Sequence, residues 1–208
     1  MREFARCAAK RHPLEAADFV LRKTPSWTAA GVKIWSRLTD PHCVPAEASR
    51  KDARALLLRK EEPYLRPALA EALVRETLPT FDERRINTAQ PLDYGTLADR
   101  LWSAKGCEYC AHAKPKEVEK AKALSSVALR PLIFAECVTR TDPESVHKML
   151  IADASSPEES AAVQALRPAF EHCVVQGDVF EASVTEVRMN LALTYYRLAN
   201  APRVQTKQ

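Results

Sequence analysis

Residues 134–174 carry the pattern from which the fold of this chain is predicted, and they read FAECVTRTDPESVHKMLIADASSPEESAAVQALRPAFEHCV. A second stretch of the same length, residues 4–44, aligns with it without a gap. Each stretch has one cysteine near its start and another within a closing His-Cys-Val. The shared residues are Phe4, Ala5, Cys7, Pro13, Ser26, Arg37, His42, Cys43 and Val44, which fall on Phe134, Ala135, Cys137, Pro143, Ser156, Arg167, His172, Cys173 and Val174. The chain is therefore predicted to contain one cysteine-framed module twice, the alternative being two similar helical hairpins built from a limited set of residues.

The local signals within residues 134–174 are those of helices. Asp142 precedes Pro143, which gives an N-cap followed by a proline at the first helical position. Ser156 and Glu159 have the spacing of a capping box. After that cap, an apolar stripe at helical spacing predicts one amphipathic helix that ends at a cysteine. The stripe consists of Val163, Leu166, Phe170 and Cys173.

A closing helix is predicted after each module. In the second module its apolar side consists of Val187, Leu191, Tyr195 and Leu198. In the first module, Arg66, Leu69, Ala70 and Arg75 match Arg188, Leu191, Ala192 and Arg197. The prediction is an all-α protein with two pseudo-symmetric helical modules, residues 1–76 and 130–208, and an inserted middle segment, residues 77–129.

The middle segment does not belong to the repeat. It is predicted to begin as a loop that contains Pro79, Asn87 and Pro91. A short helix is expected near residues 96–104, and a lysine-rich helix near residues 115–125. Between them lies the sequence Cys107-Glu108-Tyr109-Cys110.

The six cysteines divide into three candidate disulfides. Six cysteines allow fifteen connectivities, and the repeat favours the pairs Cys7–Cys43, Cys107–Cys110 and Cys137–Cys173. Each long-range bridge would close a loop of about 36 residues and would stabilise the fold by about 3–4 kcal/mol on the chain-entropy model. The alternative is six reduced cysteines, with the repeated four packed as small apolar side chains.

Disulfides would indicate an oxidising compartment, so the prediction is a periplasmic or extracellular protein. The first residues, Met-Arg-Glu-Phe-Ala-Arg, lack the apolar core of a signal peptide. The chain is therefore either cytosolic, as the alternative, or it begins after a signal that has been removed.

Cys107 and Cys110 also allow two chemical interpretations. A Cys-x-x-Cys pair can be redox-active when a helix N-terminus stabilises its first thiolate, but no strand pattern of a thioredoxin-like fold accompanies it here. A metal site would use Cys107, Cys110 and His112, although zinc requires a fourth ligand and no second pair follows nearby. A local structural disulfide is the simplest interpretation, so no metal and no cofactor are predicted.

The composition excludes several classes of function. The four glycines, Gly31, Gly95, Gly106 and Gly177, are never clustered, whereas phosphate-binding loops and nucleophile elbows need clustered glycines. The net charge of +4 is small, and acidic residues lie among the basic ones, which argues against nucleic-acid binding. No apolar run approaches the length of a membrane span.

The second copy resembles a recurring module of uncharacterised proteins from sphingomonad-type alphaproteobacteria. The resemblance rests on Phe134-Ala135-Glu136-Cys137-Val138, Asp142-Pro143, Met149-Leu150, Ser156-Pro157-Glu158-Glu159, Leu166-Arg167-Pro168, Cys173 and the run from Leu191 to Arg197. It covers the first copy more loosely and does not include the middle segment. Such proteins look secreted or periplasmic and often carry the module more than once, so the resemblance implies export and disulfides without implying an activity.

The function expected from these observations is a non-enzymatic, extracytoplasmic helical module with an interaction or structural role. Its expected partner is another protein or a second copy of the chain. The alternatives are a thiol–disulfide or metal-linked protein centred on Cys107 and Cys110, and a cytosolic helical adaptor or regulator with reduced thiols.

Overall fold

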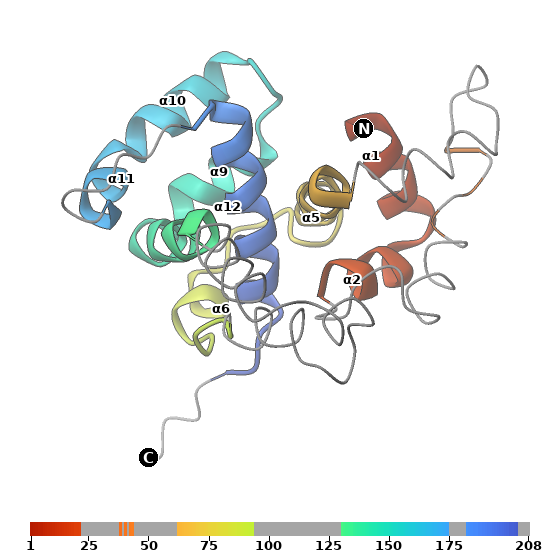
Figure 1. Cartoon of the computed structure of the whole chain (residues 1–208), viewed down its shortest axis with the longest axis horizontal. Coiled ribbons are helices and arrows are strands. Elements are labelled where there is room, and N and C mark those ends of the chain that lie inside the picture. The colour runs from red at the N-terminus through yellow and green to blue at the C-terminus, as the bar shows by residue number, and fades with distance from the viewer. Residues whose placement is uncertain are drawn as a thin grey trace, which may run out of the picture.

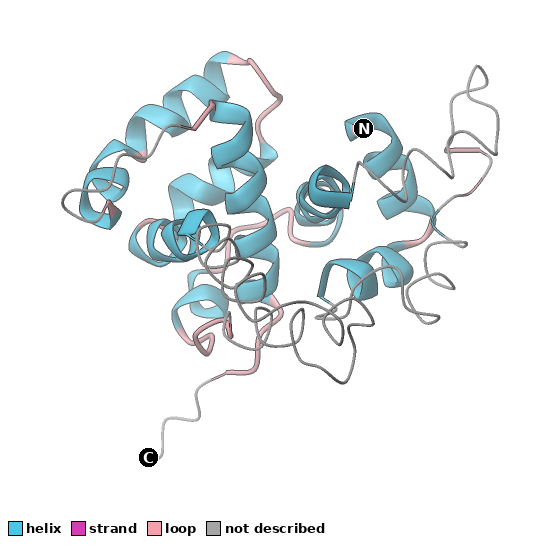
Figure 2. Ribbon diagram, in the orientation of Figure 1, coloured by secondary structure: helices cyan, strands magenta, loops and turns pink. Residues whose placement is uncertain are grey.

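The computed structural model describes residues 1–21, 38, 40, 42–43, 62–93, 130–174 and 182–203. Regular structure within these residues is helical, and a single antiparallel bridge joins Ala89 to Arg203 (Figure 2). The predicted all-α class is therefore confirmed for this part of the chain. None of its helices combines the length and the apolar character needed to cross a membrane.

Two long helices, α5 (Glu62–Thr77) and α12 (Val184–Ala199), pack against each other at the centre of the molecule (Figure 1). Both are 16 residues long. The contact between them is the most extensive one between described helices. The largest of their buried apolar residues include Leu65, Leu69 and Leu73 of α5 and Leu191, Tyr195 and Leu198 of α12, and they form the middle of the core.

The remaining helices cover this central pair from two sides. On one side, α1 (Arg2–Arg11) and α2 (Pro13–Leu21) pack on α5. On the other side, α9 (Pro143–Ile151) packs on α12, and α10 (Pro157–Ala165) packs on α9 and on α11 (Arg167–Cys173). Helical residues 130–141 directly precede α9. Figure 1 shows the red helices α1 and α2 on one side of α5, and the green-to-blue helices gathered around α12.

The predicted helix starts are confirmed by their caps. The side chain of Asp142 accepts a hydrogen bond from the backbone N–H of Ser145 at 3.0 Å. The hydroxyl of Ser156 accepts one from the N–H of Glu159 at 3.1 Å. Because each cap satisfies a backbone donor that the helix leaves free, these residues fix where α9 and α10 begin.

The prediction of a single helix between Ser156 and Cys173 is wrong in one respect. The structure breaks it at Leu166 into α10 and α11. Pro168 lies in the first turn of α11, where its missing N–H is tolerated, whereas within a continuous helix it would remove a hydrogen bond and clash with the preceding turn. Leu166 is nevertheless buried, so the apolar stripe continues across the break.

The start of the middle segment also differs from the predicted loop, because it contains the short helix α6 (Glu83–Asn87). Asp82 caps this helix by accepting a hydrogen bond from the N–H of Arg84. The following turn is held by Arg140, which donates to the carbonyl oxygens of Ala89 at 3.2 Å and Gln90 at 3.0 Å. The other elements predicted for the middle segment lie outside the described residues.

Two disulfides join residues far apart in the sequence. Cys7 is bonded to Cys43 with a Cα–Cα distance of 5.4 Å, and Cys137 is bonded to Cys173 with a Cα–Cα distance of 5.8 Å. Each bridge spans a sequence separation of 36 residues. These are the two long-range pairings that the repeated spacing predicts, and the compartment that they indicate is an oxidising one.

The turn that leads to Cys43 is held by Asp40. The carboxylate of Asp40 accepts hydrogen bonds from the backbone N–H of His42 at 2.9 Å and from the guanidinium of Arg11 at 2.8 Å, and it lies 3.0 Å from Nε2 of His12. The N–H of His42, followed by Arg11 and His12, holds the pKa of Asp40 far below its ordinary value. Asp40 therefore links the end of α1 to the turn that carries the first bridge.

This contact gives the folding stability a pH dependence. Since the pKa of Asp40 is lower in the folded protein than in the unfolded chain, its stabilising contribution is present above about pH 4 and is lost as the pH falls towards the folded value. We expect Asp40→Asn to flatten the decline of the free energy of unfolding between about pH 5 and pH 2, measured by urea unfolding. Glu144→Gln, in an exposed pair with Lys148 on α9, is the control that should keep the parent slope. An unchanged slope in Asp40→Asn would show that this carboxylate does not stabilise the turn.

Candidate functional site

The described core contains a fully buried arginine. Arg188, in the second turn of α12, has 0% exposure. Its Nη1 donates to Oε1 of Glu159 at 2.5 Å, and its Nη2 donates to Oε1 of Glu71 at 3.0 Å. Both carboxylates are themselves buried. An isolated buried charge would be strongly unfavourable, so the two carboxylates account for the position of the guanidinium.

Backbone carbonyls complete the surroundings of Arg188. Its Nη2 also donates to the carbonyl oxygens of Leu150 at 3.0 Å and Ala152 at 2.8 Å. These carbonyls lie at the C-terminal end of α9, where helical carbonyls have no partner within the helix. Arg188 therefore closes the end of α9, pairs with α5 through Glu71 and pairs with α10 through Glu159.

Glu159 has two roles at the start of α10. One of its carboxylate oxygens accepts from Arg188, and the other accepts a 2.5 Å hydrogen bond from the N–H of Ser155. Ser155 has a φ of 63°, a left-handed conformation that is uncommon for a residue with a side chain. Burial alone would raise the pKa of Glu159, but the N–H of Ser155 and the guanidinium of Arg188 outweigh burial and hold the pKa below its ordinary value. Glu159 therefore carries the negative charge that Arg188 needs.

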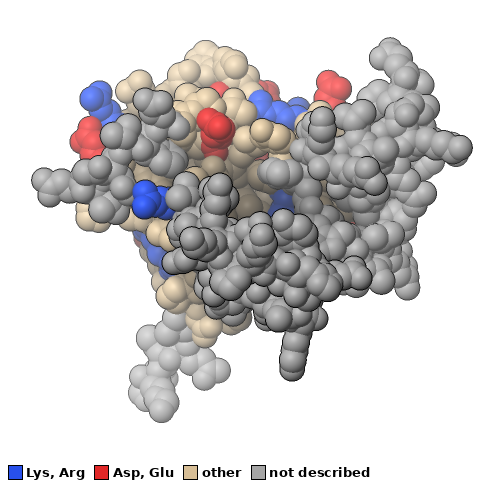
Figure 3. Space-filling view, viewed as in Figure 1, with Lys and Arg blue, Asp and Glu red and all other residues tan. Residues whose placement is uncertain are grey.

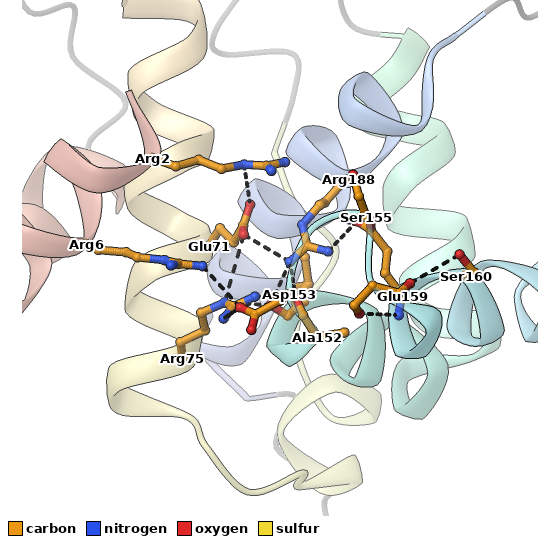
Figure 4. A network of polar contacts seen from close by, with 12 residues as sticks. Arg2, Arg6, Glu71, Arg75, Ala152, Asp153, Ser155, Glu159, Ser160 and Arg188 are labelled. Carbon is orange, nitrogen blue, oxygen red and sulfur yellow. Dashed lines mark hydrogen bonds and ion pairs between the residues drawn. The ribbon is translucent and has the colours of Figure 1, made fainter.

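Three further arginines surround this buried cluster (Figure 4). Arg75 of α5 donates to the carbonyl oxygens of Leu150 at 3.0 Å and of Ala152, and to the carboxylate of Asp153 at 3.1 Å. Figure 4 shows Arg6 and Arg2 reaching the cluster from α1. Arg6 contacts Asp153 at 3.5 Å, and Nε of Arg2 lies 3.9 Å from Oε2 of Glu71. The turn between α9 and α10 is thus bound by side chains from α1, α5 and α12.

The buried cluster of Arg188, Glu71 and Glu159 is suited to holding helices together. Each carboxylate in the buried cluster faces a guanidinium, and an arginine remains charged at all ordinary pH values and cannot serve as an acid or base. Among the buried side-chain polar atoms of the described residues, Nε of Arg188 and Oγ1 of Thr194 have no hydrogen-bond partner. The cluster therefore provides a fixed electrostatic connection between helices.

An open cleft of about 560 Å³ adjoins this cluster. Its walls come from the start of α1, one side of α5 and the first turns of α12. Glu71 belongs both to the buried cluster and to the cleft wall. Elsewhere, on the face shown in Figure 3, acidic and basic side chains of the described residues are interspersed.

Known proteins give no further guidance. No family model, characterised protein or solved structure matches this chain.

The structure does not bring the predicted site residues together at the cleft. Cys7, Cys43, Cys137 and Cys173 form the two bridges, and none of them lines the cleft. Cys107, Cys110 and His112 lie outside the described residues, so the redox and metal interpretations of that segment stay predictions. Within the described ranges, no three His, Cys, Asp or Glu side chains are arranged to hold a metal ion.

In the repeat, Arg188 is the counterpart of Arg66, and this match does not predict its burial. One signal was available, because Arg188 precedes Leu191, Tyr195 and Leu198 at intervals of three, four and three positions, the spacing of a single helix face. That position favours contact between the arginine stem and the core, but it does not specify burial of the guanidinium. Its partners could not be identified, since Glu159 is 29 and Glu71 is 117 positions away in the chain.

Proposed function

We propose that this chain is a non-enzymatic helical interaction module of an oxidising compartment outside the cytoplasm, built from two related copies. The observation that carries the proposal is the pair of long-range disulfides, each of which closes a loop of the same length within a helical fold. Such bridges persist in oxidising compartments and stabilise modules with limited cores. The resemblance to secreted or periplasmic modules supports the same location.

The helix boundaries support the proposed duplication. The central helices begin at Glu62 and Val184 and end at Thr77 and Ala199, so one constant offset relates both ends. Each copy also has a helix that is interrupted just before a proline, Pro13 in the first and Pro143 in the second. We therefore propose that the two copies are related by pseudo-symmetry about the contact between α5 and α12.

An interaction role is supported by the nature of the charged cluster and by the exposed apolar residues. The cluster joins helices through ion pairs, while the adjoining cleft remains open. Several large apolar side chains at or next to the cleft are exposed, namely Met1, Tyr64 and Val184. Exposed apolar residues beside a concave surface are typical of sites that bind another macromolecule.

The location and the redox state can be tested in cells that express the natural gene. Thiols are blocked with a membrane-permeant alkylating reagent before lysis, and the cysteine peptides are then analysed by mass spectrometry with and without reduction. We expect Cys7, Cys43, Cys137 and Cys173 to be protected until reductant is added, and the protein to fractionate outside the cytoplasm. Alkylation of all four without reductant would overturn the proposal and would favour the cytosolic adaptor.

The interaction role can be tested in the same cells with a photo-crosslinking amino acid placed at Tyr64, beside the cleft. We expect crosslinked products of discrete mass, identifiable as another protein or as a second copy of this chain. The same amino acid at Leu14, which is 80% exposed on α2, is the matched control. Equal, diffuse labelling from both positions would count against a specific interaction surface.

A further inference from the structure

The cleft combines exposed apolar side chains with two carboxylates. Tyr64, which lies on its wall, is 51% exposed, and Val184, between the lining residues Ser183 and Thr185, is 52% exposed. Ala68 and Met189 line its interior. Isolated exposed apolar residues are common and need no explanation, but Tyr64, Ala68 and Met189 line the same concave surface.

The carboxylates on the wall are Glu71 and Glu186. Oε1 of Glu71 is bound by the buried Arg188, and Oε2 faces Arg2 at 3.9 Å, which is beyond hydrogen-bonding distance. Oε2 of Glu186 accepts from the N–H and the hydroxyl of Ser183, both at 2.8 Å. The described residues provide no hydrogen bond to Oε1 of Glu186. Oε1 of Glu186 thus remains for a further donor, and Oε2 of Glu71 has only the distant ion pair with Arg2.

Glu186 is ionised at neutral pH. The N–H of Ser183, and then its hydroxyl, lower the pKa of Glu186 below its ordinary value. Glu186 therefore places a fixed negative charge on the cleft wall that also carries Tyr64, Met189 and the cationic Arg2.

We propose that the cleft binds an arginine side chain of a partner polypeptide, together with an apolar residue beside that arginine. This inference rests on the proposed function and specifies the chemistry of its partner. An arginine fits because its guanidinium donates to carboxylates and also stacks on aromatic rings, while its aliphatic stem packs on apolar surface. The partner guanidinium hydrogen-bonds to the available oxygens of Glu186 and Glu71 and lies against Tyr64.

The chain's own Arg2 already stands at this cleft. Its guanidinium faces Oε2 of Glu71 without a close hydrogen bond, and its side chain is 38% exposed. Arg2 therefore competes weakly with the partner's arginine for Oε2 of Glu71. Removing Arg2 should therefore increase the affinity of the cleft for a basic ligand.

The test uses the oxidised full-length chain and the peptide acetyl-Leu-Arg-Leu-amide. The control peptides carry citrulline, the neutral isostere of arginine, or glutamate at the central position. Binding is followed from backbone amide shifts in two-dimensional NMR. We expect the arginine peptide to cause saturable shifts at Tyr64, Ala68, Glu186 and Met189, with binding about tenfold weaker for citrulline, which corresponds to one lost charge-assisted contact. No saturable shifts, or equal binding of citrulline, would overturn the proposal.

Variants assign the binding to named side chains. Glu186→Gln removes the charge but keeps the capping interaction with Ser183, and we expect it to weaken binding of the arginine peptide about tenfold. Tyr64→Ala should weaken binding, whereas Tyr64→Phe should preserve it. Arg2→Ala should strengthen binding. Weaker binding in Arg2→Ala, or tighter binding of the glutamate peptide than of the arginine peptide, would show that the cleft prefers an anion and would overturn the proposal.

The two proposals fail in different ways. Reduced cysteines in cells would overturn the proposed function whatever the peptides do. A partner that is crosslinked at Tyr64 and still binds normally to Glu186→Gln would leave the interaction module intact and would refute the arginine site. Thermal unfolding of each variant shows whether a loss of binding reflects a loss of fold.

Discussion

Arg188→Met is expected to lower the free energy of unfolding by about 3–5 kcal/mol, the range found when one partner of a buried ion pair is removed. Methionine fills much of the volume of arginine, so the expected loss comes mainly from the charges that remain. Glu71 and Glu159 would be left as two buried carboxylates without their shared counter-charge. The carbonyls of Leu150 and Ala152 would also lose a donor. Urea unfolding of the oxidised protein at neutral pH measures the effect.

A second variant separates the charge from the packing. Arg188→Met combined with Glu71→Met and Glu159→Gln removes the unpaired charges and retains an amide side chain that can accept from Ser155. We expect this triple variant to recover a substantial part of the stability lost in Arg188→Met, because apolar replacement of a whole buried ion cluster is often close to neutral. If the triple variant were less stable than the single one, the carboxylates would not be the source of the loss.

Replacing Cys137 and Cys173 together by alanine is expected to lower the free energy of unfolding by roughly 4 kcal/mol on the chain-entropy model. The same value is expected for the Cys7 and Cys43 pair, because both bridges span 36 residues. The effect arises mainly in the unfolded chain, which gains conformations when the loop is opened. Denaturant unfolding of the two double variants and of the oxidised parent makes the comparison.

The matched control is the parent protein unfolded in the presence of a strong reductant. It should be less stable than either double variant, because it lacks both long-range bridges. The entropy of closing the loop is the same for both bridges. A difference in stability between the two double variants would therefore show that the bridges differ in their effect on the native state. A double variant as stable as the oxidised parent would contradict a stabilising role for that bridge.

The parts of this fold that were predictable are those specified by neighbouring residues. Asp142-Pro143 and Ser156 with Glu159 are local signals, and the structure confirms the helices that begin there. Equal cysteine spacing is a local pattern that occurs twice, and it predicted the two long-range pairings. The break at Leu166 was also encoded locally in Pro168, but the apolar stripe crosses that break and favoured a single helix.

The buried cluster was not predictable because it depends on distant partners. An arginine on a helix usually extends into solvent, and only the packing of α5, α9 and α10 around α12 places Arg188 among carboxylates and carbonyls. The cleft has the same origin. Tyr64 and Glu186 lie far apart in the chain and line the same cleft only because α5 packs on α12.

The turn between α9 and α10 has a consequence for cooperativity. The carbonyls of Leu150 and Ala152 receive hydrogen bonds from Arg75, in the first half of the chain, and from Arg188, in the second. If residues 1–93 were separated from residues 130–208, Arg75 would lose its acceptors and Arg188 would lose Glu71. Each half would lose polar contacts that only the other half supplies, so the two halves are expected to unfold in a single transition, as one thermodynamic unit.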